Sequence, residues 1–165
     1  MPSLIRLRFT LNGQPVAVQC QPGTRLLDLL REEFDLREAR EGCGRGECGA
    51  CLVLMDGRAV NACLVPAFML ADCEIVTAEG LAQQKEHAEL RRALAAYDLS
   101  GCGYCEAGLA IALAALLLSD PDPGEEDVQR ALSGNRCACG ACGCRPSARS
   151  GAAFPSDRRR SSARR

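Results

Sequence analysis

The stretch Glu41-Gly42-Cys43-Gly44-Arg45-Gly46-Glu47-Cys48-Gly49-Ala50-Cys51 decides the fold. Its three cysteines are spaced C-x₄-C-x₂-C, and glycines stand between them. Glycine adopts backbone conformations that other residues avoid, so such a stretch can fold tightly and point its amides inward. Three thiols in so short a glycine-rich segment predict a loop that surrounds a metal centre.

The cysteine spacing is that of plant-type ferredoxins, which hold a [2Fe–2S] cluster with four cysteines. A fourth sulfur is expected from the segment after the loop, where residues 52–55 predict a short strand, Asp56-Gly57 a turn and residues 60–63 a return. Structural zinc fits less well, because it commonly uses paired C-x₂₋₄-C units and often histidine. The predicted ligands are Cys43, Cys48, Cys51 and Cys63.

The residues before the loop predict a hairpin followed by a helix. Residues 4–11 alternate as a strand, Asn12-Gly13 is a strong hairpin turn, and residues 16–20 return as the partner strand. Thr24 is the expected N-cap of a helix over 25–34. With residues 74–77 completing the sheet, this order predicts a β-grasp domain over residues 1–80.

Residues 81–144 predict a small helical domain. Helices are expected over 87–97, 103–119 and 125–132, with the breaker 120–124 before the last. The middle helix is apolar on nearly every side from Leu109 onward, so other helices must cover it. Its longest apolar stretch, 109–118, is only half of the ~20 residues that cross a bilayer, so no membrane span is expected.

A second cysteine group accompanies these helices. It comprises Cys102, Cys105, Cys137 and Cys139. The first two form a C-x₂-C unit at the expected start of a helix, where partial positive charge stabilises a thiolate or an anionic cluster. On spacing alone this group could be redox-active, bind zinc or hold a second [2Fe–2S] cluster.

Composition bounds the compartment and the partners. The chain has 12 cysteines in 165 residues, and its first residues lack the apolar core of a signal peptide, so reduced, metal-binding thiols in the cytoplasm are expected. Residues 145–165 carry seven arginines and one acid, with Phe154 as the only aromatic residue. A solvated, disordered tail is the simpler interpretation, and no nucleic-acid partner is expected.

Taken together, the motifs resemble those of the small iron–sulfur subunit of the molybdenum hydroxylases, the xanthine dehydrogenase, aldehyde oxidoreductase and carbon monoxide dehydrogenase family. The resemblance covers residues 3–140. The segments that carry it are residues 41–51, Gly101-Cys102-Gly103-Tyr104-Cys105 and Ser133-Gly134-Asn135-Arg136-Cys137-Ala138-Cys139.

The resemblance implies an α+β chain with a β-grasp domain and a C-terminal four-helix bundle, each holding one [2Fe–2S] cluster. All eight cysteines of the two groups would be ligands. Electrons would come from a molybdenum–pterin centre on a large catalytic subunit, pass through the helical cluster and then the plant-type cluster, and reach FAD on a medium subunit. This chain itself would carry no substrate chemistry.

Three positions depart from the family pattern. Gly101 stands where the family usually has a glutamine that meets the pterin, and Glu106 adds negative charge beside the second motif. The expected apolar helix after Cys139 is replaced by Cys142-Gly143-Cys144, a second Cys-x-Cys unit that leaves the ligand register open. Gly134-Asn135 favours Cys137 and Cys139.

Three alternatives therefore stand beside the molybdenum hypothesis. The chain could serve a flavin-dependent dehydrogenase without molybdenum, or act as a free two-cluster ferredoxin. It could also be a zinc-binding interaction module with a basic tail.

Overall fold

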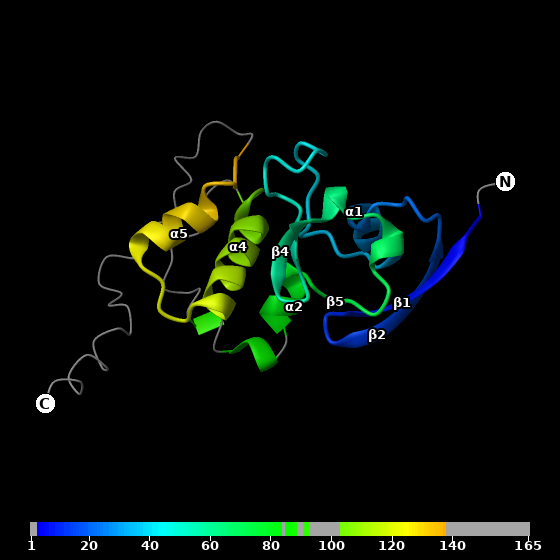
Figure 1. Ribbon diagram of the computed structural model, residues 1–165, viewed down its shortest axis with the longest axis horizontal. Coiled ribbons are helices and arrows are strands. Elements are labelled where there is room, and N and C mark those ends of the chain that lie inside the picture. Colours follow the sequence, from blue (N-terminus) through cyan, green and yellow to red (C-terminus); the bar gives the residue numbers. More distant parts are fainter. Residues whose placement is uncertain (1–2, 84, 89–90, 93–102, 138–165) are drawn as a thin grey trace, which may run out of the picture.

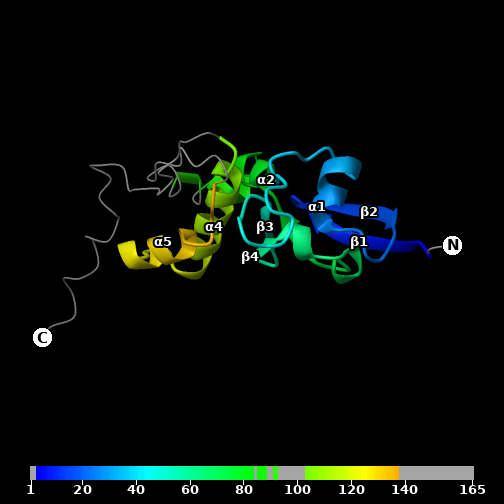
Figure 2. The same cartoon turned by 90° about the horizontal axis from the view of Figure 1, so that it is seen from above.

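A computed structural model describes residues 3–83, 85–88, 91–92 and 103–137 of the chain. The strands and the first helix occupy one end of the molecule, and the helices after residue 105 occupy the other (Figure 1). The view from above shows the same order along the long axis (Figure 2). The loop that carries the first cysteine group lies between these two parts.

The predicted hairpin is confirmed. Strand β1 (Ile5–Leu11) pairs antiparallel with β2 (Gln14–Cys20), with Leu11 opposite Gln14. Asn12 and Gly13 have φ values of 50° and 73°, which is the left-handed pair that a tight hairpin turn of this twist requires.

Three further strands extend the hairpin into a mixed sheet of order β2-β1-β5-β3-β4. They are β3 (Leu52–Met55), β4 (Arg58–Asn61) and β5 (Glu74–Val76), close to the predicted ranges. β5 lies at the centre, parallel to β1 and antiparallel to β3. β5 therefore joins the two hairpins, and this sheet bears out the ferredoxin-like part of the predicted fold.

The helix that crosses the sheet begins later than predicted. α1 (Leu26–Asp28) runs directly into a π-helical segment, Leu29–Glu33, and the cap residue is Arg25 with no side-chain cap bond. Thr24 is therefore not the N-cap. Arg25 forms an isolated bridge with Pro66, which keeps its backbone extended and delays the first helical residue.

The helix and the sheet enclose the first hydrophobic core. Leu26, Leu27 and Leu30 are fully buried, and Phe34 meets Phe9 edge-on with ring centroids 5.9 Å apart. These residues form the apolar helical stripe expected from the sequence. Burying such side chains contributes about 1.5–3 kcal/mol each to the stability of the fold. This core therefore fixes the position of the loop that follows the helix.

The second part of the chain packs helices against the opposite side of β3. It contains α2 (Ala78–Gln83), a 3₁₀ turn (Lys85–His87), α4 (Glu106–Ser119) and α5 (Glu125–Leu132). α5 matches its predicted range, and α4 begins three residues later than predicted. α4 contacts both β3 and α5, so the apolar helix is covered by a strand as well as by helices.

Parts of the predicted organisation lie outside the described residues. The helix expected over 87–97 falls largely there, and the four-helix bundle stays a prediction. Gly80, the expected domain boundary, lies within α2. In the described part of the chain, no helix is long and apolar enough to cross a membrane.

Candidate cluster-binding site

The glycine-rich loop is fastened at both of its ends. The Arg40 amide donates to the carbonyl of Ala50 at 3.1 Å, which closes the loop at its base. The Arg25 guanidinium donates to the carboxylates of Asp28 at 2.6 Å and Glu41 at 2.8 Å. The hydrogen bond from Arg25 lowers the pKa of Glu41, so the carboxylate stays ionised and the contact persists. The helix start and the loop start are thereby tied together.

The glycines of this loop are needed for two different reasons. Gly44, Gly46 and Gly49 have positive φ values between 65° and 79°, where other residues are strained. Gly42 instead lacks space: a Cβ there would lie 2.6 Å from the Cys48 sulfur. The backbone therefore passes close to the thiols, as the sequence predicted.

The outer two thiols accept hydrogen bonds from backbone amides. Cys43 Sγ accepts from Glu47 at 3.1 Å and from Arg45 at 3.5 Å, and Cys48 Sγ accepts from the amide of Cys43 at 3.3 Å. The amides of Arg45 and Glu47 lower the pKa of Cys43 to about 7. The loop is therefore polarised to hold negative charge on sulfur, which is the form that binds a metal.

The inner two thiols lie under the loop. Cys51 follows it directly, and Cys63 sits in a 3₁₀ turn (Ala62–Leu64) after β4; both are buried. Burial raises the pKa of Cys51 to about 12, although the amide of Cys63 opposes this shift. A buried thiol of this kind becomes a thiolate when a bound cation supplies the compensating charge.

The four thiols of the first group lie close enough to influence one another. Cys48 affects the pKa of both Cys43 and Cys51, and Cys63 affects the pKa of Cys51. A [2Fe–2S] cluster needs four such cysteines, because each of its two irons takes two of them. Across the described ranges, no three His, Cys, Asp or Glu side chains gather as a site for a single metal ion.

The second cysteine group is described in part. Cys105 is the buried residue directly before α4, and Cys137 packs against the same apolar cluster as Cys105. The fold therefore brings together one cysteine from each half of the group, which are far apart in the sequence. The remaining predicted positions, Gly101, Cys102, Cys139, Cys142 and Cys144, lie outside the described residues.

The two motifs also contact each other on one side through Arg40. Its guanidinium donates to the Gly103 carbonyl at 2.5 Å and lies over the Tyr104 ring, 5.5 Å from the centroid. The Tyr104 hydroxyl donates in turn to the carbonyl of Glu41. Arg40 carries no motif signal of its own, and the sequence reasoning missed it.

A second contact involves the segment before Cys137. The Asn135 side chain donates to the Gly49 carbonyl at 3.4 Å, and the Arg136 amide donates to the Cys48 carbonyl at 2.9 Å. Gly108 of α4 faces the same turn, and a Cβ there would lie 2.0 Å from the Gly49 oxygen. The sequence places Asn135 in the second motif, but no local pattern predicts its contact with the first loop.

Comparison with protein-family models finds both motifs. Residues 9–92 match the 2Fe-2S iron-sulfur cluster binding domain, and residues 77–144 match the [2Fe-2S] binding domain. The first match includes the loop and Cys63. The second includes both halves of the second cysteine group.

Among curated proteins, the chain is 39% identical to the nicotinate dehydrogenase small FeS subunit of Eubacterium barkeri, over 82% of this chain and 86% of that protein. It is also 39% identical to the xanthine dehydrogenase iron-sulfur-binding subunit of Escherichia coli, over 82% and 86%. A solved structure of quinoline 2-oxidoreductase from Pseudomonas putida 86 superposes with a TM-score of 0.71 at 36% identity, covering 82% of this chain and 84% of that one.

Proposed function

This chain belongs to the small iron–sulfur subunits of the molybdenum hydroxylase family, and we propose that it relays electrons from a molybdenum–pterin subunit to an FAD subunit. It carries two [2Fe–2S]-binding domains and serves as the non-catalytic, electron-transfer part of an oxidoreductase. The observation that carries the proposal is the gathering of four interacting thiols at the glycine-rich loop, beside a second motif whose flanking residues contact that loop.

The residues of the first site fit a two-iron cluster. Cys43 and Cys48 would hold one iron, and Cys51 and Cys63 the other. The amides of Arg45 and Glu47 point at sulfur and would stabilise the added negative charge of the reduced state. When bound, a [2Fe–2S] cluster accepts and returns one electron at a time.

For the second site we propose Cys102, Cys105, Cys137 and Cys139 as ligands. Two observations support it: Cys105 lies at the N-terminus of the fourteen-residue α4, and Cys137 reaches the same cluster of apolar residues. The N-terminal end of a long helix favours an anionic group. The division of the chain into residues 1–80, 81–144 and the tail 145–165 belongs to the same proposal.

The proposed partners are a large molybdenum–pterin catalytic subunit and a medium FAD subunit, with the substrate bound by the former. The names of the relatives support this assignment, since they are subunits of nicotinate and xanthine dehydrogenases. The complex would work in the cytoplasm, where thiols stay reduced for cluster assembly. Gly101 keeps one alternative open, a flavin-dependent partner without molybdenum.

Anaerobic purification of the chain with its neighbouring subunits, followed by metal and pterin analysis, tests the proposal. We expect about four irons per chain and molybdenum in the large subunit. A content of about two irons per chain would mean that the helical domain holds no cluster. A large subunit without molybdenum or pterin would favour the flavin alternative, and a colourless chain after reconstitution would contradict both redox functions.

A further inference from the structure

One backbone hydrogen bond links the two cysteine groups, and we propose that it carries the electron between the two clusters. The Arg136 amide donates to the Cys48 carbonyl at 2.9 Å. Cys48 is a proposed ligand of the first cluster, and Arg136 directly precedes Cys137, a proposed ligand of the second. An unbroken path of covalent bonds and this one hydrogen bond therefore joins two ligand sulfurs. The inference rests on the proposed function, because it takes both cysteines as ligands.

The step needs no further reactant. One electron would leave one cluster, which is thereby oxidised, and enter the other cluster, which is thereby reduced. No covalent bond forms or breaks, and no proton has to accompany the electron. The protein's contribution is to keep the two ligand backbones in contact.

The contact is built to stay closed. The Asn135 side chain donates to the carbonyl of Gly49, the residue after Cys48, and so holds the next peptide as well. Gly108 lets α4 approach the same carbonyl, since any Cβ there would meet it at 2.0 Å. The Asn135 side chain and helix α4 thus both contact the peptide that follows Gly49, next to the Cys48 carbonyl.

The second contact between the motifs offers a poorer route. It passes from Glu41 through the hydroxyl and ring of Tyr104, and Glu41 stands two residues before Cys43. Electronic coupling weakens with every bond in the path, and this path adds a whole side chain. We therefore assign Arg40 and Tyr104 to positioning, and the Arg136 amide to the route itself.

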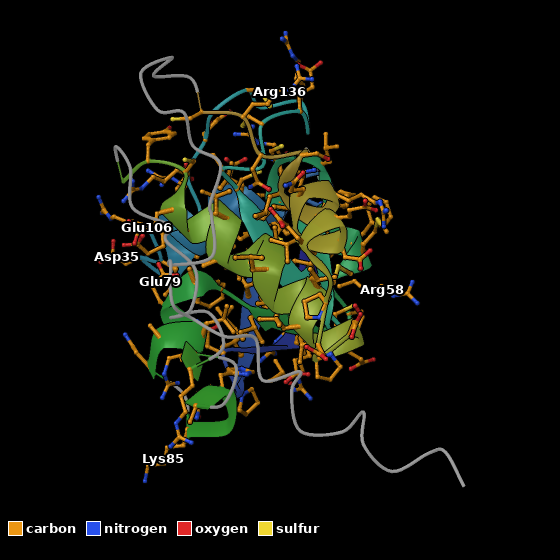
Figure 3. All side chains as sticks on the ribbon, turned by 90° about the vertical axis from the view of Figure 1, so that its left-hand side faces the viewer. Asp35, Arg58, Glu79, Lys85, Glu106 and Arg136 are labelled. Carbon is orange, nitrogen blue, oxygen red and sulfur yellow. The ribbon has the colours of Figure 1, made fainter. Side chains whose placement is uncertain are left out.

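The amide of residue 136 can be tested apart from its side chain. The Arg136 side chain is exposed and points away from the ribbon (Figure 3). Arg136→Ala removes the side chain and keeps the N–H donor. Arg136→Pro removes the donor as well, because proline has no backbone N–H. The two variants form a matched pair that differs in the bond in question.

The experiment uses the purified complex, reduced rapidly by one electron and followed by freeze-quench electron paramagnetic resonance, which separates the two cluster signals. We expect Arg136→Pro to slow the transfer between clusters several-fold relative to Arg136→Ala, with the iron content and both resting signals unchanged. Equal rates in the two variants would overturn the proposal. So would a slowed transfer in Tyr104→Phe together with a normal rate in Arg136→Pro.

A second pair covers the case in which proline prevents assembly of the helical cluster. Gly108→Ala should force α4 away from the Gly49 carbonyl, whereas Gly134→Ala meets no atom within 4 Å. Slower transfer in Gly108→Ala alone, at full iron content, supports the route, and equal rates contradict it. Failure of the proposed function looks different, since the unmodified chain would then lack one or both cluster signals.

Discussion

The space beside the Cys48 sulfur limits which side chain residue 42 can carry. The Gly42 backbone passes so close to Cys48 that a methyl group would overlap the sulfur. Such an overlap can be relieved only if the thiol or the loop moves. Because a cluster requires its four sulfurs at fixed positions, even a small displacement here should affect iron binding more than it affects the fold.

We therefore expect Gly42→Ala to reduce the plant-type resonance signal and the iron content, while the circular dichroism of the chain stays near normal. Gly23→Ala is the matched control, because a Cβ at Gly23 has no atom within 4 Å. Both glycines lie between β2 and β3, and neither has a positive φ. Equal iron contents in the two variants would show that the loop accommodates the methyl group without cost.

Charge at a single residue should tune the second cluster. Glu106 is the first residue of α4, beside Cys105, and its side chain is exposed. Its negative charge disfavours a further electron on an anionic cluster, so Glu106→Gln should raise the reduction potential of the helical cluster. Redox titration followed by resonance spectroscopy measures this shift. Glu125→Gln, at the start of α5, should leave both potentials unchanged.

At the scale of helices and strands, the sequence predicts correctly those elements whose position depends on residues only a few positions away. The Asn12-Gly13 turn and the helix over 125–132 appear as predicted, because the turn residues and the breaker before the helix act within a few positions. The helix start near Thr24 shifted, because Arg25 pairs with Pro66, which is distant in sequence. The contacts of Arg40 and Asn135 likewise join segments that are distant in the sequence, so no local sequence pattern predicts them.

The apolar helix α4 offers a stability test at this scale. Leu113 is fully buried and Leu118 is 51% exposed, although both are leucines of the same helix. Leu113→Ala should lower the stability by about 2–5 kcal/mol, because it removes buried methyl groups and leaves a cavity. Leu118→Ala should change it little. Anaerobic urea unfolding followed by circular dichroism compares the stabilities of the two variants. Equal urea midpoints for Leu113→Ala and Leu118→Ala would mean that α4 is not packed as described.

At the scale of the whole molecule, the described, buried cysteines of the two groups belong to different hydrophobic cores. The core under the first loop is built from residues 7–75, whereas Cys105 belongs to a core of α4 and α5. β3 touches the helical cores through Leu52 and Leu54. The two parts are therefore joined by packing, but among the residues that the structure describes they do not share the buried side chains around Cys51 and Cys63 on one side and Cys105 on the other.

This separation predicts that either cluster can be lost alone. Cys43→Ser should impair the plant-type signal, while Cys139→Ser should impair the other signal and leave about two irons per chain. The double variant Cys142→Ser with Cys144→Ser is the control, because Cys137 packs against the apolar cluster that contains Cys105, which favours the earlier Cys-x-Cys unit as ligands. If the double variant abolished the second signal while Cys139→Ser spared it, the ligand register would have to move to Cys142 and Cys144. Loss of both signals in any one of these variants would instead mean that the two cores fold as a single unit.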